Sequence, residues 1–265
     1  MSKNIAIIGG GNLGTAIAEG LIKKRFAKPE NIWITKRNTS TLQSLKEKGV
    51  HVGDNNGAAV KSSDLVILAV KPFQAIEVLE EIAKELVPSK HILVSVVTGV
   101  LLKEIQEIIN KDLPVFRAMP NTAIAIGESM TCISTKGASK EHIQYVTDLF
   151  EQLGLVTMID EKLMDAATIL GACGTAYAMR YIRASIQGGI EIGFDVATAS
   201  LIAAQTVKGA AELLLKKGTH PEHEIDKVTT PKGCTIAGLN EMEHQGFSSS
   251  LIKGIMVSYR KIAKD

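Results

Sequence analysis

The sequence predicts an α/β protein in which a Rossmann-type, doubly wound N-terminal domain, residues 1–160, is followed by an all-helical C-terminal domain, residues 161–265. Three observations support this prediction. Over the first 160 residues, short β-branched runs alternate with helical patterns, which is typical of βαβ units and a mostly parallel sheet. A glycine-rich turn follows the first strand pattern. After Asp160 the strand patterns stop, and helical patterns rich in Ala and Gly continue to the C-terminus.

The expected strands are short runs of apolar and β-branched residues: Ile5–Ile8, Ile32–Ile34, Leu65–Val70, Ile92–Val97, Val115–Arg117, Met130–Ser134 and Val156–Ile159. The run Leu65–Val70 is apolar throughout, as in central strands covered on both faces. Helical patterns are expected between the strands, at Asn12–Lys24, Thr39–Lys48, Phe73–Leu86, Leu101–Ile109 and Lys140–Leu153.

The second domain is expected to contain long helices at Lys162–Gln187 and Ala197–Lys217. Their small residues allow helices to approach closely. Their apolar stripes are more extensive than one small domain can cover, so we expect a homodimer or a higher homo-oligomer.

Composition excludes several classes of function. The 265 residues carry 30 basic and 28 acidic side chains, and a net charge of +2 predicts no nucleic-acid partner. Gly, Lys or Glu interrupts the longest apolar stretches, so no membrane span is expected. The three cysteines and six histidines lack metal-ligand spacing, which predicts no metal site. An odd number of cysteines argues against a disulfide framework and predicts a reduced, cytoplasmic protein.

The glycine-rich turn is the first candidate site. It reads Gly9-Gly10-Gly11-Asn12-Leu13-Gly14, and it lies between a strand pattern and a helical pattern. In this position glycines permit a tight turn and close approach to a pyrophosphate at the helix N-terminus. We therefore predict dinucleotide binding by Gly9, Gly11, Asn12, Leu13 and Gly14. The alternative is a turn that serves only strand–helix packing.

The end of the second strand pattern indicates which dinucleotide binds. A site that prefers NAD usually has Asp or Glu there, whereas this chain has Thr35-Lys36-Arg37-Asn38. Lys36 and Arg37 suit a 2′-phosphate, which Arg can bind with two hydrogen bonds. NADPH is therefore the expected cofactor and NADH a weaker one, unless the two cations form only a solvated basic loop.

Three further segments resemble the pyrroline-5-carboxylate reductase family, and the resemblance runs from Ile5 to about Phe247. Ala69-Val70-Lys71-Pro72 is the family's A-V-K-P, and Arg117-Ala118-Met119-Pro120-Asn121-Thr122 matches its R-x-M-P-N-T. The longest is Val228-Thr229-Thr230-Pro231-Lys232-Gly233-Cys234-Thr235-Ile236-Ala237-Gly238-Leu239, which is similar to V-T-S-P-G-G-T-T-I-A-G-L.

The resemblance implies an NAD(P)H-dependent reduction of 1-pyrroline-5-carboxylate to proline by an intertwined dimer. It implies that Asn56 contacts the cofactor and that the substrate carboxylate is bound at Gly233, Cys234 and Thr235, with Thr235 assigned as catalytic. Ala69, Val70, Lys71 and Pro72 follow a strand at the carboxyl edge of the sheet, where ligands bind in open α/β folds. Met119 and Asn121 follow another strand and are expected at the nicotinamide pocket.

Two departures from the family pattern leave other functions open. Where the family has S-G-S-G-P-A-Y, this chain has Gly171-Ala172-Cys173-Gly174-Thr175-Ala176-Tyr177, and Lys232 replaces a glycine. One alternative is a hydroxyacid dehydrogenase of the 6-phosphogluconate-dehydrogenase-like group, although the second domain lacks the K-x-x-N pattern of those enzymes. The other is a paralogue that binds NADPH without catalysing a reaction.

Overall fold

The structure, a computed structural model, describes residues 3–263 and divides into two compact units at Cys173–Gly174. The sequence predicts this division earlier, after residue 160. The difference arises because the first residues of the predicted helical domain pack on the sheet. Met164 is fully buried, and Glu161 forms an ion pair with the buried side chain of Arg117 at 3.0 Å.

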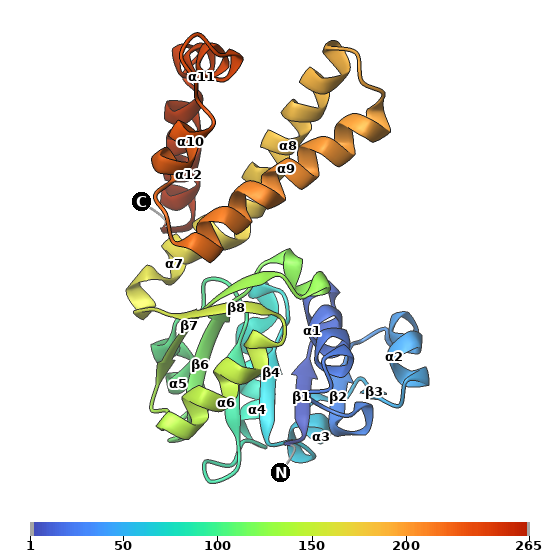
Figure 1. Cartoon of the computed structure of the whole chain (residues 1–265). Helices are drawn as coiled ribbons and strands as arrows, with labels where there is room; N and C mark the ends of the chain where they lie inside the picture. The colour runs from blue at the N-terminus through green and yellow to red at the C-terminus, as the bar shows by residue number, and fades with distance from the viewer. Residues whose placement is uncertain (1–2, 264–265) are drawn as a thin grey trace. The chain divides into compact units, whose positions relative to one another are not determined.

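The first unit is built on an eight-stranded sheet in the order β3-β2-β1-β4-β5-β6-β7-β8 (Figure 1). The strands are β1 (Ile5–Ile8), β2 (Ile32–Thr35), β3 (His51–Gly53), β4 (Leu65–Leu68), β5 (Ile92–Ser95), β6 (Val115–Met119), β7 (Ser129–Lys136) and β8 (Gly154–Met158). Every neighbouring pair is parallel except β6 and β7. The strand order reverses between β1 and β4, which is where ligands bind in doubly wound sheets.

Helices cover both faces of the sheet: α1 (Asn12–Lys23), α2 (Gln43–Glu47), α3 (Asn56–Lys61), α4 (Ala75–Ala83), α5 (Leu102–Ile109) and α6 (Lys140–Glu151). Because successive strand residues point to opposite faces, Ile5 and Ile7 pack in one core with residues of α1 and α6. Ala6 and Ile8 pack in a second core with residues of α4 and α5. The predicted Rossmann-type fold is therefore confirmed.

Several predicted elements differ in extent. The strands expected at Leu65–Val70 and Ile92–Val97 end at Leu68 and Ser95. The helix expected at Phe73–Leu86 begins as a 3₁₀ turn, Pro72–Gln74, and its α-helical part ends at Ala83. The helix expected at Thr39–Lys48 likewise begins as a 3₁₀ turn, Thr39–Leu42. Strand β3 and helix α3 were not predicted, because elements this short leave little periodic pattern.

The helix expected at Lys162–Gln187 is interrupted. The structure has a 3₁₀ turn at Glu161–Leu163, a short helix α7 (Met164–Ala167), a π-helical segment Thr168–Cys173 and then α8 (Gly174–Glu191). Further 3₁₀ turns lie at Pro29–Asn31 and Thr122–Ile126. Short π-helical segments inside helices are frequent at functional sites.

The second unit consists of α8, α9 (Val196–Lys217), α10 (Pro221–Lys227), α11 (Cys234–His244) and α12 (Phe247–Ala263). Helices α8 and α9 pack together, and a Cβ on Gly189 would lie 3.1 Å from the Cβ of Ala199. Helix α8 also contacts α12, where the Tyr177 hydroxyl donates to Ser258 at 2.7 Å. Small residues thus permit the close helix packing that the composition predicts.

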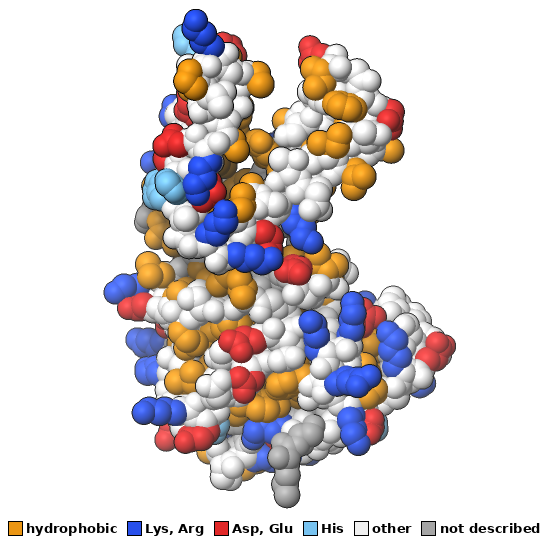
Figure 2. All heavy atoms as spheres, in the orientation of Figure 1, with side chains coloured by type: hydrophobic (Ala, Val, Ile, Leu, Met, Phe, Trp, Pro, Cys, Tyr) orange, Lys and Arg blue, Asp and Glu red, His pale blue; other side chains and the backbone are white. Residues whose placement is uncertain are grey.

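Large apolar side chains are exposed over this helical unit, as Figure 2 shows in orange. Leu201 is 71% exposed, Leu215 65%, Val257 63% and Ile252 60%. Exposed apolar surface of this extent usually marks a surface that another protein covers. Among the described residues, no helix combines the length and the apolar character that a bilayer crossing requires.

Candidate cofactor and substrate sites

A cavity of about 1070 Å³ lies at the carboxyl edge of the sheet. The segments that follow β1, β2, β4 and β5 line it, together with the start of α1 and one face of α4. All the cofactor residues predicted from the sequence line this cavity except Gly14 and Met119. The parallel strands bring these separate motifs together, because their carboxyl ends meet at one edge.

The glycine turn fits a cofactor that needs close approach to the backbone. Gly9 has a φ of +114°, and a Cβ there would lie 2.5 Å from the carbonyl oxygen of Ala69. Gly11 precedes the first residue of α1 and supplies no side-chain cap. The first N–H groups of α1 are therefore available to an anion such as a pyrophosphate.

Gly14 is required for packing and does not line the cavity. A Cβ on Gly14 would lie 2.1 Å from the carbonyl oxygen of Gly9, so no larger residue fits between α1 and the turn. Gly14 was predicted to contribute to the cofactor site, and the structure gives it a packing role, because it allows α1 to lie close to the turn. This is the role expected of the third glycine in such a motif.

The end of β2 supplies the basic side of the cavity. Thr35 accepts backbone hydrogen bonds from Gly9 and Gly10 at 3.2 and 2.7 Å, which ties the glycine turn to β2. Lys36 is half-buried and donates from Nζ to the hydroxyl of Thr41 at 2.7 Å, whereas the Arg37 side chain is exposed. Arg37 is therefore the better placed of the two to reach a ligand.

At the end of β6, Met119 lies in a different place from the one predicted. Met119 is only 7% exposed and does not line the cavity. Its sulfur accepts a hydrogen bond from the Thr98 hydroxyl at 3.9 Å. Thr98, which the sequence did not single out, lines the cavity in its place. Met119 occupies the last position of β6, and its depth in the sheet cannot be read from the local sequence.

Asn121 lines the cavity and connects it to the π-helical segment. Its Oδ1 accepts the backbone N–H of Ala123 at 3.0 Å, and its Nδ2 donates to the carbonyl oxygen of Gly171 at 3.2 Å. Ala172, in the same π-helical segment, also lines the cavity. The segment in which this chain departs from the family pattern therefore includes part of the cavity wall.

The predicted substrate turn belongs to the second unit. The N–H of Gly233 donates to the carbonyl oxygen of Thr230 at 2.9 Å, and Lys232 has a φ of +60°. With Pro231 before it, this is the geometry of a type II turn, in which glycine is usual at the position of Lys232. Helix α11 begins directly after the turn, at Cys234, and Gly233 gives it no side-chain cap.

This turn bears on the assignment of Gly233 to the substrate, which stays a prediction. Its single N–H group is already used in closing the turn, so the donors available at the start of α11 are the N–H groups of Cys234 and Thr235. Cys234 is exposed and Thr235 is half-buried.

Other reactive groups give no sign of a separate catalytic centre. Within residues 3–263, no three His, Cys, Asp or Glu side chains come together as a metal site would require. Burial raises the pKa of the half-buried Cys132 thiol, which disfavours the reactive thiolate.

Two family models match the chain. The model described as pyrroline-5-carboxylate reductase dimerisation matches residues 161–265, and the model described as NADP oxidoreductase coenzyme F420-dependent matches residues 4–99. The first model begins at the predicted domain boundary, whereas the compact units divide at Cys173–Gly174.

Relatives and solved structures agree with these models. The chain is 43% identical to pyrroline-5-carboxylate reductase 2 of Dictyostelium discoideum, over 99% of this chain and 93% of that protein. It is 47% identical to pyrroline-5-carboxylate reductase 1 of the same organism, over 98% of this chain, and it spans about half, 49%, of that relative's length. A pyrroline carboxylate reductase of Plasmodium falciparum, solved with NADP bound, superposes with a TM-score of 0.89 at 26% identity, covering 98% and 97% of the two chains.

Proposed function

This chain belongs to the pyrroline-5-carboxylate reductase family, and we propose that it reduces the carbon–nitrogen double bond of 1-pyrroline-5-carboxylate with NADPH to give proline. The observation that carries the proposal is the cavity at the carboxyl edge of the sheet, which joins the glycine turn, the basic end of β2 and the Ala69–Pro72 segment. The chain is an oxidoreductase that uses a nicotinamide cofactor. The choice of NADPH and the roles of individual residues are part of the proposal.

The cofactor is assigned to the cavity on the chemistry of its walls. Gly9 and Gly11, with the uncapped start of α1, suit the pyrophosphate. Arg37 is assigned to the 2′-phosphate of NADPH, and Lys36 is the second candidate. No acidic residue directly follows β2 to repel that phosphate. NADH lacks that phosphate and is expected to bind more weakly. When bound, NADPH supplies the hydride for the reaction.

The substrate carboxylate is assigned to the start of α11. The N–H groups of Cys234 and Thr235 and the Thr235 hydroxyl can donate to one carboxylate there, and the helix dipole favours negative charge. A protonated imine is already an electrophile, and the proton on its nitrogen stays in the product amine. The chain therefore needs mainly to orient the pyrroline ring and less to supply an acid. Positioning can account for much of the decrease in the activation barrier.

The helical unit carries the features that favour association between copies of this chain. A family model for reductase dimerisation matches residues 161–265, and large apolar side chains are exposed there. The chain forms a homo-oligomer, and we propose a homodimer through α8–α12 as its smallest active form. Its cysteines are free, in accord with a reduced, cytoplasmic setting.

Replacing Thr235 by Val tests the substrate assignment, because it keeps the side-chain shape and removes the hydroxyl. If that hydroxyl bonds a charged oxygen, kcat/KM for the pyrroline should fall roughly ten- to more than a hundredfold, the equivalent of about 1.5–3 kcal/mol. NADPH affinity should be almost unchanged.

Thr229→Val is the matched control. The Thr229 hydroxyl donates to the carbonyl oxygen of Ile225 at 2.8 Å and is thus occupied inside the protein. This variant should lose about 1 kcal/mol of stability and keep its kcat/KM. If the Thr235 variant behaves like this control, Thr235 does not bind the substrate.

A further inference from the structure

A chain of side-chain hydrogen bonds crosses the wall of the cofactor cavity. The buried Thr35 hydroxyl, at the end of β2, donates to Oδ1 of Asn56 at 2.7 Å. Nδ2 of Asn56, at the start of α3, donates to Oε2 of Glu81 on α4 at 2.9 Å. All three residues line the cavity. The carbonyl group of the same Thr35 holds the amides of Gly9 and Gly10, so the chain is connected to the glycine turn.

Glu81 decides the orientation of the Asn56 amide. A threonine hydroxyl can donate or accept, so Thr35 by itself is compatible with either orientation. An ionised carboxylate can only accept, and a rotated amide would place Oδ1 of Asn56 against a carboxylate oxygen of Glu81. With Glu81 present, Oδ1 faces Thr35 and Nδ2 faces Glu81. The second hydrogen of Nδ2 is then a donor of fixed position at the cavity wall.

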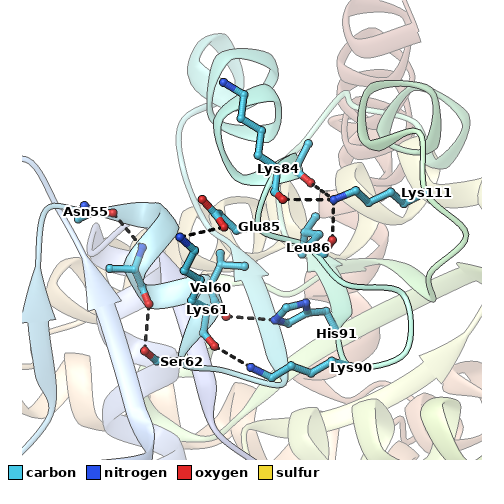
Figure 3. A network of polar contacts seen from close by, with 12 residues as sticks. Asn55, Val60, Lys61, Ser62, Lys84, Glu85, Leu86, Lys90, His91 and Lys111 are labelled. Carbon is cyan, nitrogen blue, oxygen red and sulfur yellow. Dashed lines mark hydrogen bonds and ion pairs between the residues drawn. The ribbon is translucent and has the colours of Figure 1, made fainter.

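Further contacts join the last residue of α3, Lys61, to the residues that follow α4. Figure 3 shows this network, in which the Lys61 ammonium pairs with Glu85 at 3.2 Å and Nζ of Lys90 donates to the carbonyl oxygen of Lys61 at 2.6 Å. Nζ of Lys111 donates to the carbonyl oxygens of Ala83 and Leu86, each at 2.7 Å, which closes the end of α4. These contacts join α3, which carries Asn56, to α4, which carries Glu81.

We infer that Glu81 is a positioning residue for the cofactor: it holds the amide of Asn56 so that its free N–H points to an acceptor oxygen of the bound dinucleotide. The inference rests on the proposed function, since it takes the cavity as the NADPH site. Glu81 does not itself contact the reacting atoms. The sequence gives no signal for this residue, because one glutamate on a helix surface is indistinguishable from its neighbours.

Direct titration of the purified chain with NADPH, followed by nucleotide fluorescence, tests the inference without requiring turnover. Glu81→Ala should raise the Kd for NADPH roughly three- to tenfold, a modest factor because the Glu81 side chain is exposed. Glu81→Gln, which keeps an acceptor for Asn56 but no longer forbids rotation of the amide, should give an intermediate value. The KM for NADPH should rise with the Kd, and the KM for the pyrroline should not.

Two further variants separate positioning from other effects. In an Asn56→Ala background, Glu81→Ala should cause little additional loss, because the amide that it orients is gone. Glu80→Ala is the matched control, since Glu80 is an exposed glutamate on the same helix that does not line the cavity, and it should change the Kd little.

The inference is overturned if Glu81→Ala leaves NADPH binding unchanged or tightens it, as simple repulsion between carboxylate and phosphate would predict. It is also overturned if the effects of Asn56→Ala and Glu81→Ala add fully. Failure of the unmodified chain to bind NADPH is a different result, and it would contradict the proposed function itself.

Discussion

Replacing Glu161 by Ala should leave a buried positive charge without its partner. The Arg117 side chain is 2% exposed, and its Nη1 lies 3.0 Å from Oε1 of Glu161. Its Nε and Nη2 atoms are buried and have no hydrogen-bond partner among the described residues. The same Glu161 oxygen also accepts the N–H of Leu102, at the start of α5, at 2.6 Å.

The expected loss follows from these contacts. Breaking a buried ion pair by removing one partner costs about 3–5 kcal/mol. Glu161 keeps 29% of its side-chain exposure, so water can reach the vacated position and reduce that figure. Including the lost bond to Leu102, we expect Glu161→Ala to lower the free energy of unfolding by about 2–4 kcal/mol. Arg117→Met should cost less, because it removes the buried charge as well.

Urea unfolding at one fixed protein concentration measures these losses, since oligomer formation makes stability concentration-dependent. Glu107→Ala is the control: Glu107 pairs with Lys103 at 3.7 Å on the exposed surface of α5, and its removal should cost no more than about 0.5 kcal/mol. The double variant Arg117→Met/Glu161→Ala should be less stable than Arg117→Met only by the lost bond to Leu102, about 1 kcal/mol. The reasoning is wrong if Glu161→Ala costs no more than Glu107→Ala, or if Arg117→Met costs more than Glu161→Ala.

Three other predictions concern the cofactor, the substrate turn and the pH dependence of stability. Arg37→Ala should weaken NADPH binding by about 1–3 kcal/mol and NADH binding much less; equal losses by titration would mean that Arg37 does not contact the 2′-phosphate. Lys232→Gly should raise the free energy of urea unfolding by about 1 kcal/mol, because a φ of +60° is unfavourable for a lysine and costs glycine nothing; no gain would show that the turn relaxes at no cost. Burial lowers the pKa of His91, and its Nδ1 accepts the N–H of Val87 at 2.7 Å, so the folded state prefers the neutral ring. Because the pKa of His91 in the folded state lies below the ordinary 6.5, its contribution to the free energy of unfolding is present above that pH and is lost as the pH falls below it. The free energy of unfolding of a His91→Gln variant should therefore fall less between about pH 7 and about pH 5.

Local chemistry explains which parts of the site could be predicted from the sequence. The glycine turn and the Ala69–Pro72 segment each follow a strand, and the parallel order of the strands brings them together. These motifs need no knowledge of distant contacts, because their backbone requirements appear as Gly and Pro at fixed spacing.

The differences between the predicted site and the structure depend on tertiary contacts. Met119 was assigned to the pocket, but it is buried and does not line the cavity, and its sulfur contacts the hydroxyl of Thr98. Gly233 was assigned to the substrate, but its N–H closes a turn with Thr230. Whether a strand-end side chain faces a cavity, or which partner takes a single N–H, is decided by tertiary packing.

Glu81 was not predicted, and the compact units divide later than the predicted domain boundary, for a related reason. The role of Glu81 can be inferred only when α4 is placed beside α3, which brings Oε2 of Glu81 to 2.9 Å from Nδ2 of Asn56. The segment 161–173 has a helical pattern, but Met164 and Glu161 attach it to the sheet unit. Helical periodicity shows that a segment is amphipathic, but it does not show which partner covers its apolar side.

The central claim is that this chain reduces a cyclic imine with NADPH, and turnover measures it most directly. NADPH absorbance should fall when 1-pyrroline-5-carboxylate is added to the unmodified chain, proline should accumulate in equal amount, and NADP with 2-hydroxy or 3-hydroxy acids should give no reaction. NADPH binding without loss of absorbance would identify a non-catalytic cofactor-binding protein, and oxidation of a hydroxy acid would identify a dehydrogenase. Either result would contradict the proposed reaction.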